Sequence, residues 1–410
     1  KALGWTDNST TATFSAITTA GMFLGALVGG IIGDKTGRRN AFILYEAIHI
    51  ASMVVGAFSP NMDFLIACRF VMGVGLGALL VTLFAGFTEY MPGRNRGTWS
   101  SRVSFIGNWS YPLCSLIAMG LTPLISAEWN WRVQLLIPAI LSLIATALAW
   151  RYFPESPRWL ESRGRYKEAE KVMRSIEEGV IHQTGKPLPP VVIADDGKTP
   201  QAVPYSALLT GVLLKRVILG SCVLIAMNVV QYTLINWLPT IFMTQGINLK
   251  DSIVLNTMSM FGAPFGIFIA MLVMDKIPRK TMGVGLLILI AVLGYIYSLQ
   301  TSMLLITLIG FFLITFVYMY VCYASAVYVP EIWPTEAKLR GSGLANAVGR
   351  ISGIAAPYAV AVLLSSYGVT GVFILLGAVS IIVAIAIATI GIETKGVSVE
   401  SLSIDAVANK

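Results

Sequence analysis

Four charged or titratable side chains lie inside long apolar stretches of this sequence: Glu46, His49, Arg69 and Arg350. A charge in such surroundings is costly and is normally paired with another polar group. The guanidinium of Arg350 could bind a carboxylate through two parallel hydrogen bonds, or it could pair with a distant part of the protein. His49 could transfer protons or could be a hydrogen-bonded packing residue, and Glu46 is the proton-binding candidate beside it.

Polar and aromatic side chains in the same apolar stretches are candidates for contacts with a small ligand. They are Asn108, Gln231, Tyr232, Asn236, Trp237, Tyr318 and Tyr323. Aromatic residues near the ends of apolar segments can equally be anchors at a membrane surface. Spacing alone does not fix which way these side chains point.

A second group of charged residues occupies short polar loops, and this group is present twice. The first copy contains Asp34, which follows Gly33, with Arg38, Glu89, Arg96 and Glu155, and the second contains Asp275, Arg279, Glu331, Arg340 and Glu393. Three short matches in the same order indicate a duplicated half, which is typical of transporters. A carboxylate such as Asp34 can stabilise the positive end of a neighbouring helix, and ordinary loop charge is the alternative.

The elements that carry these residues are long and apolar. Hydrophobic residues make up 56% of the 410 positions and charged residues only 12%, which is about half the charged share of a soluble domain. A helix needs about 20 largely apolar residues to cross a bilayer. We therefore expect an all-α polytopic membrane protein with eleven visible spans: 12–33, 41–59, 63–88, 103–125, 133–153, 212–243, 252–274, 281–299, 303–329, 341–365 and 369–391.

Lysine and arginine are concentrated at one set of loop ends, including 34–39, 94–102 and 151–216. The positive-inside rule places these loops and the C-terminus in the cytoplasm. This bias explains the net charge of +8 without a nucleic-acid partner. We expect four segments: an N-terminal bundle at 1–153, cytoplasmic loop helices and a linker at 154–211, a C-terminal bundle at 212–391 and a cytoplasmic tail at 392–410.

The duplication also predicts one helix more than the eleven. The second half has six spans, beginning with 212–243, whereas the first half has five. The counterpart of 212–243 would precede residue 1. We therefore expect the given chain to lack a first membrane helix that the natural protein has, and a genuine eleven-span protein is the alternative.

Four motifs resemble those of the major facilitator superfamily. The loop GDKTGRR (33–39) resembles its loop between helices 2 and 3, and CRFVMGVGLGA (68–78) resembles the fourth helix of its sugar porters. PESPRWL (154–160) is close to the sugar-porter signature after helix 6, and IETKG (392–396) is similar to a weakened form of the signature after helix 12. The resemblance covers essentially the whole chain. It implies two six-helix bundles around a cavity that opens to one side at a time.

The resemblance also implies roles for the charged residues. The gating residues would be Gly33, Asp34, Arg38, Glu89, Arg96, Glu155, Arg158, Asp275, Arg279, Glu331, Arg340 and Glu393. For Glu155, Arg158 and Glu393, a solvated helix end is the alternative. In proton-coupled sugar porters, the arginine that matches Arg69 pairs with an aspartate on the first helix, so the coupling candidates visible here are Arg69, Glu46 and His49.

The stretches 227–242 and 344–357 depart from the sugar-porter pattern, and the second resembles the branch that carries aromatic acids, nicotinate and organic ions. We therefore expect a proton-coupled secondary transporter for a small polar metabolite, such as a carboxylated metabolite or organic anion. A sugar or polyol porter is the alternative. We expect a monomer in the bacterial inner membrane, with lipid, protons and the substrate as partners, and no cofactor, metal or enzymatic activity, because no metalloprotease or nucleotide-binding motif is present.

The distribution of positive charge generates a topology prediction. A cysteine introduced at Lys198, in the middle of the long basic loop, should react with impermeant thiol reagents only from the cytoplasmic side. The measurement is labelling of intact cells against inverted vesicles. Labelling from outside in intact cells would reverse the predicted orientation.

Overall fold

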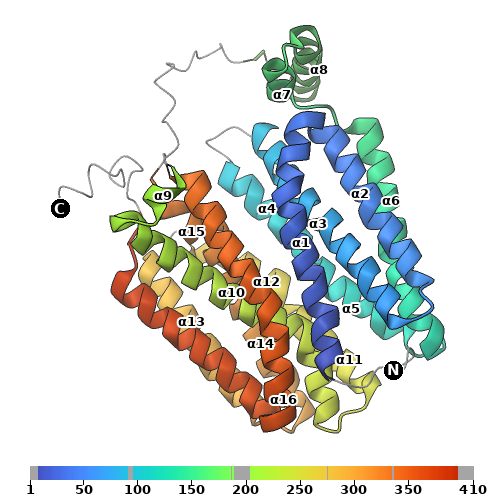
Figure 1. Cartoon of the computed structure of the whole chain (residues 1–410), viewed down its shortest axis with the longest axis vertical. Helices are drawn as coiled ribbons and strands as arrows, with labels where there is room; N and C mark the ends of the chain where they lie inside the picture. Colours follow the sequence, from blue (N-terminus) through green and yellow to red (C-terminus); the bar gives the residue numbers. More distant parts are fainter. Residues whose placement is uncertain are drawn as a thin grey trace. The chain divides into compact units, whose positions relative to one another are not determined.

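The computed structural model describes residues 8–90, 96–185, 187–188, 204–274, 276–334 and 337–395. All regular secondary structure in these ranges is helical, and Figure 1 shows long helices that run side by side. The predicted all-α class is confirmed.

The chain folds into two compact units, each assembled from separate stretches of sequence. The first contains residues 1–16, 98–130 and 200–410, and the second contains 17–97 and 131–199. The predicted domain boundaries at 153, 211 and 391 remain a prediction.

The second unit is built mainly from six helices (Figure 1). These are α1 (Asn8–Thr36), α2 (Arg38–Ala57), α3 (Met62–Tyr90), α6 (Ala127–Tyr152), α7 (Pro157–Ser162) and α8 (Tyr166–Thr184). The first unit is built mainly from α4 (Arg96–Asn108), α5 (Ser110–Leu121), α9 (Tyr205–Leu208), α10 (Gly211–Thr244), α11 (Leu249–Met260), α12 (Gly262–Val273), α13 (Arg279–Ser298), α14 (Met303–Val321), α15 (Val329–Glu331) and α16 (Lys338–Ile390). A π-helical turn, Cys322–Tyr328, joins α14 to α15.

Within the described ranges, nine helices are long and apolar enough to cross a membrane. One of them, α16, contains the two predicted spans 341–365 and 369–391, with Gly368 between them at φ 65 and ψ −160. A left-handed φ of this kind favours glycine. The predicted span 103–125 corresponds to α4 and α5, which are not among these nine. The predicted first helix lies outside this chain and stays a prediction.

Two of the breaks between helices have a local cause. Proline has no N–H, so it leaves the carbonyl four residues earlier without its helical partner. α4 ends at Asn108, four residues before Pro112, and α11 ends at Met260, four residues before Pro264. Each proline therefore accounts for a break that divides one apolar stretch into two helices.

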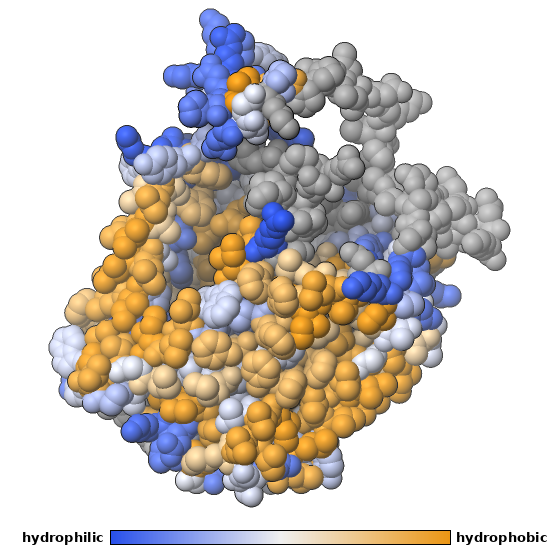
Figure 2. All heavy atoms as spheres, turned by 180° about the vertical axis from the view of Figure 1, so that it is seen from behind, coloured by the Kyte–Doolittle hydropathy of each residue, from blue (hydrophilic) through white to orange (hydrophobic). Residues whose placement is uncertain are grey.

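The helices present apolar surface outward. On α6, Ile140, Leu141, Leu143 and Ile144 are each more than half exposed, and apolar residues dominate the surface drawn in Figure 2. Soluble proteins rarely expose contiguous apolar patches of this extent. Lipid is therefore the natural neighbour of these helices.

Glycines allow α1 and α3 to approach closely in the second unit. A Cβ at Gly21 or Gly25 of α1 would overlap the backbone of α3, and a Cβ at Gly73 or Gly77 of α3 would overlap the backbone of α1. Small residues four apart on two facing helices are a common packing device in membranes. The glycines of the GVGLG stretch therefore serve helix packing.

This contact generates a stability prediction. Gly25→Ala places a methyl group against the carbonyl oxygen of Val74, so it should destabilise the protein by about 1–3 kcal/mol through overpacking. Thermal unfolding of the purified protein measures the effect. Gly285→Ala is the matched control, because a Cβ there meets nothing within 4 Å. Equal stability of the two variants would contradict the close packing.

Candidate functional site

In the second unit, the carboxylate of Glu155 binds the start of α2 from a distant part of the chain. Its Oε1 accepts hydrogen bonds from the backbone N–H of Arg38 at 2.7 Å and of Arg39 at 3.2 Å. The first N–H groups of a helix lack helical partners, and a negative charge is favourable there. Gly37, at φ 96, precedes the helix, and a Cβ on it would overlap the Glu155 carboxylate. Glu155 thus takes the place of a local N-cap side chain.

Asp34 contributes to the same cluster mainly through its backbone. Its carbonyl oxygen accepts hydrogen bonds from Trp159 Nε1 and from Arg163 Nη2, each at 2.7 Å. Its carboxylate pairs with Arg38 at 2.7 Å, but the Asp34 side chain is 72% exposed. Exposed ion pairs contribute about 0–1 kcal/mol. The carbonyl contacts and the Glu155 cap therefore hold this junction more firmly than the exposed pair does. Arg158, which is exposed, lines a hollow beside it with Asp34 and Arg38.

The first unit repeats the cap with different surroundings. Glu393 Oε1 accepts a hydrogen bond from the backbone N–H of Arg279 at 2.7 Å, and its Oε2 accepts one from Lys280 at 3.1 Å. These are the first residues of α13. The match of Glu155 with Glu393 in the sequence repeat is therefore a match of two helix caps.

Arg279 carries a second carboxylate in this copy. Its guanidinium donates from Nε and Nη2 to the two carboxylate oxygens of Glu331, at 3.0 and 3.1 Å, and also donates to the carbonyl of Met274. The Thr394 hydroxyl donates to Glu331 at 2.6 Å. The Arg279 side chain is only 7% exposed. Two-pronged pairing of this kind is strong and geometrically specific.

The pKa of the Glu393 carboxyl lies below its ordinary value. Burial by itself raises this pKa. Hydrogen bonds from the backbone N–H groups of Arg279, Lys280 and Lys395, together with the charge of Arg279, lower it by more than burial raises it. These groups all favour the ionised carboxylate. Glu393 is therefore a charged cap at neutral pH.

The structure brings together six of the predicted gating residues: Asp34, Arg38 and Glu155 in one unit, and Arg279, Glu331 and Glu393 in the other. Gly33 packs beside Thr82. The Arg340 guanidinium lies 5.2 Å from the ring centre of Tyr205. Asp275 and the side chains of Glu89 and Arg96 lie outside the described residues. The gating roles of the whole set stay predictions.

A polar and aromatic cluster lies among α5, α10, α14 and α16 of the first unit. The Tyr111 and Tyr318 rings meet edge-on, with centroids 5.2 Å apart. Gln231, Tyr111 and Tyr232 are close enough to the Tyr318 hydroxyl to interact with it electrostatically, and Arg350 interacts with Tyr232 in the same way. The Tyr318 hydroxyl is buried, and the Tyr111 hydroxyl and the Gln231 side chain lie within hydrogen-bonding reach of it, in a geometry short of a full hydrogen bond. Four of the predicted ligand residues therefore gather in one place.

The other predicted ligand residues have different surroundings. Trp237 is fully buried, and among the described residues its Nε1 has no hydrogen-bond partner. Tyr323 stacks on Tyr328 with ring centroids 5.0 Å apart. The Asn108 amide donates to the carbonyl of Ser104 on its own helix, and Asn236 is half-buried on α10.

Sequence reasoning missed several residues of these sites. Tyr111 and the pair Asn256 and Ser115, joined at 3.3 Å, lie on α5 and α11. Trp159 and Thr394, which support the two junctions, were not predicted either. The sequence did contain a signal for Trp159 and Thr394, because they lie inside the motifs PESPRWL and IETKG.

The three coupling candidates lie in the second unit. Arg69 Nε donates to the Thr18 hydroxyl at 3.0 Å. His49 Nδ1 lies 3.6 Å from Glu46 Oε2 on the next turn of α2. Thr18 was not predicted as a partner for Arg69.

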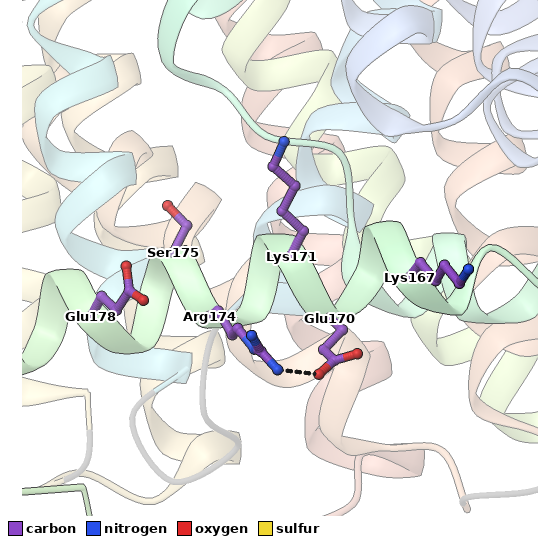
Figure 3. A pocket seen from close by; sticks show the side chains of 6 residues that line it. All are labelled: Lys167, Glu170, Lys171, Arg174, Ser175 and Glu178. Atoms are coloured by element: carbon purple, nitrogen blue, oxygen red, sulfur yellow. Dashed lines mark hydrogen bonds and ion pairs between the residues drawn. The ribbon is translucent and has the colours of Figure 1, made fainter.

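A charged hollow on α8 is not a substrate site. Figure 3 shows its six lining side chains, Lys167, Glu170, Lys171, Arg174, Ser175 and Glu178, all of which come from this one helix. Arg174 and Glu170 pair at 2.8 Å, and both are mostly exposed. This is the solvated face of an amphipathic helix.

Three comparisons with known proteins agree with this architecture. The profile of the family "Sugar (and other) transporter" matches residues 4–406. YdjK of Escherichia coli (strain K12), whose name assigns it provisionally to metabolite transport, is 99% identical over 100% of this chain and 89% of its own. The inner membrane metabolite transport protein YdjE of the same organism is 44% identical over 98% of this chain and 88% of its own.

A solved structure, the xylose transporter XylE from E. coli in a partially occluded inward-open conformation, matches with a TM-score of 0.75. The match covers 95% of this chain and 89% of that chain at 18% identity. It confirms the fold that the motifs predicted.

The lowered pKa of Glu393 generates a pH prediction. Because the folded pKa lies below the unfolded one, the cap is fully formed above the unfolded pKa and is lost as pH falls through the folded one. Hydrogen exchange at the amides of Arg279 and Lys280, corrected for intrinsic rates, should therefore lose protection as pH is lowered from neutral to below about 4. In Glu393→Gln, protection should be lower at neutral pH and nearly independent of pH. The same pH dependence in wild type and variant would contradict the cap.

Proposed function

This chain belongs to the sugar (and other) transporter family of the major facilitator superfamily, and on this premise we propose that it carries a small sugar or polyol across the inner membrane by alternating access, driven by protons. The family and its relatives are transporters, so the protein is a multi-pass membrane transporter and not an enzyme. The family description favours the sugar or polyol alternative over the carboxylated metabolite, which was the first expectation from the sequence.

The buried Tyr318 hydroxyl carries this proposal. Its contacts with Tyr111 and Gln231 fall short of full hydrogen bonds, and a buried polar group that lacks a full partner costs about 1–3 kcal/mol. A ligand hydroxyl that can both donate and accept would satisfy it. The Gln231 amide, close enough to act on the same hydroxyl, offers two donors and an acceptor. The adjoining Tyr111 ring adds an apolar face. Hydroxyl groups on a compact carbon skeleton match this combination.

The caps at the helix starts support alternating access. Each links the start of one helix, α2 or α13, to a segment more than a hundred residues away through a few hydrogen bonds. A few kcal/mol separate the conformations of a two-state protein. Loss or gain of one such cap is enough to shift the population, so we assign Glu155 and Glu393, with Asp34, Arg38, Arg279 and Glu331, to the cytoplasmic gate. The cytoplasmic C-terminus and a monomeric state belong to the same proposal.

A carboxylated substrate is the second candidate, and Arg350 is the observation that favours it. The guanidinium is half-buried on α16 and interacts electrostatically with Tyr232, next to Gln231. A permanent positive charge beside a ligand cluster suits a carboxylate. Replacement of a desolvated partner of this kind costs about 2–5 kcal/mol.

One binding screen separates the two candidates. Purified protein is tested by thermal shift and calorimetry with D-xylose and myo-inositol, with the acids xylonate and gluconate, and with nicotinate. A sugar or polyol should bind, and Gln231→Ala should weaken it by about 0.5–1.5 kcal/mol, the value of one hydrogen bond. Arg350→Ala should change the affinity for the neutral ligand by less than that.

Gln300→Ala is the control, because that side chain follows α13 and donates to the carbonyl of Ile296 in the last turn of that helix. Binding of an acid alone, abolished by Arg350→Ala, would replace the sugar proposal by the carboxylate one. Binding of a neutral ligand that is indifferent to Gln231→Ala would remove the cluster from the substrate site.

A further inference from the structure

Two titratable side chains in the middle of α2 face each other. Glu46 Oε2 and His49 Nδ1 lie 3.6 Å apart. The side chains are 10% and 14% exposed, and both atoms are buried without a hydrogen bond to any group among the described residues. The distance is slightly longer than a hydrogen bond. A small adjustment of either side chain would let them share a proton.

The pair lies deep in a membrane-spanning helix. Glu46 stands eight residues after the start of α2, which is about 12 Å along the helix axis. Gly75 of α3 packs closely against the backbone of α2 at His49, since a Cβ there would lie 3.1 Å from the backbone nitrogen of His49. An ionisable group at such a depth is costly and marks a functional site by default.

The other titratable groups around the pair have partners of their own or lie toward the ends of α2. Tyr45, next to Glu46, donates its hydroxyl proton to the Gly29 carbonyl of α1 at 2.8 Å. From α3, Cys68 faces α2 at Gly56, and Arg69 donates to Thr18. From α6, Arg132 donates to the carbonyls of Ala57 and Ser59 beyond the far end of α2.

We infer that Glu46 and His49 together form an intramembrane proton-binding site that couples transport to a proton gradient. Loaded with one proton, the pair is neutral overall, either as carboxylate with imidazolium or as carboxylic acid with neutral imidazole. Without that proton the pair carries one negative charge. Loading forms one O–H or N–H bond with a proton taken from water, and unloading returns the proton to water.

The cost of buried charge links the protonation of this pair to the conformation of the protein. A net charge deep in a low-dielectric region is strongly opposed. The unloaded pair is therefore stable only where water reaches it, while the loaded pair tolerates a closed cavity. The protein would pass through its occluded state with the proton bound. This link rests on the proposed transport function, whereas proton binding by the pair does not.

Titration of the single membrane histidine tests the pair itself. The chain has two histidines, and the second, His182, lies exposed on α8. His182→Gln therefore leaves one imidazole signal in nuclear magnetic resonance of histidine-labelled protein in nanodiscs, followed between about pH 5 and 8. Glu46→Gln in this background should alter the His49 signal and its pH dependence, because the variant removes the carboxylate that lies 3.6 Å from Nδ1. An unchanged His49 titration would overturn the inference.

Transport by the full chain in proteoliposomes tests the coupling, with D-xylose, myo-inositol and nicotinate as probes. Glu46→Gln and His49→Gln should each reduce uptake driven by a pH gradient by about tenfold, while exchange of labelled for unlabelled substrate without a gradient stays within about twofold. Retained exchange also shows that the variants are folded. His182→Gln is the matched control and should behave as wild type.

Full gradient-driven uptake by both variants would overturn the coupling role. Absence of both uptake and exchange in the wild type for every probe is a different result: it contradicts the proposed function, and the histidine titration then decides the proton site alone.

Discussion

A bilayer interior offers no water to a polar group, so a buried donor or acceptor in this protein is costly unless the chain itself or a bound ligand supplies its partner. The helices satisfy their own backbone groups along most of their length. Their ends cannot, because the first N–H groups of each helix have no helical partner. At α2 and α13 the missing partner is a carboxylate supplied from more than a hundred residues away. The ends of these two helices thus depend on the loops that follow other helices.

The two copies of this arrangement share the cap and differ in the charge around it. In the second unit the accompanying pair of Asp34 and Arg38 is exposed on the aspartate side. In the first unit Arg279 is buried, held by both oxygens of Glu331 and by a carbonyl. A buried, doubly bonded arginine is far harder to separate than an exposed pair, because separation would leave an uncompensated buried charge. The duplicated halves therefore differ in how firmly the arginine of each junction is held.

The sequence predicted the long elements well, because composition and spacing determine them locally. The positions of the spans followed from apolar length, and the gap at Gly368 was predicted. The breaks before Pro112 and Pro264 were not, because 103–125 and 252–274 were each predicted as one span. The π-helical turn at Cys322–Tyr328 has no comparable local signal. The sites were predicted only in part, since motifs indicated Glu155 and Glu393 but not the backbone N–H groups they bind. Tyr111 was missed because its place beside Tyr318 depends on how α5 packs against α14, which a one-dimensional pattern does not contain.

The two caps also bear on how this family can vary. Glu155 and Glu393 contact main-chain N–H groups, so the bonds do not depend on which side chain follows. Position 39 holds arginine and position 280 holds lysine, and the cap is the same in both. The capped positions can therefore change without loss of these bonds. Proline is the one exception, because it has no backbone N–H to donate. Variation can therefore accumulate on the helix while selection acts on the glutamate that binds it.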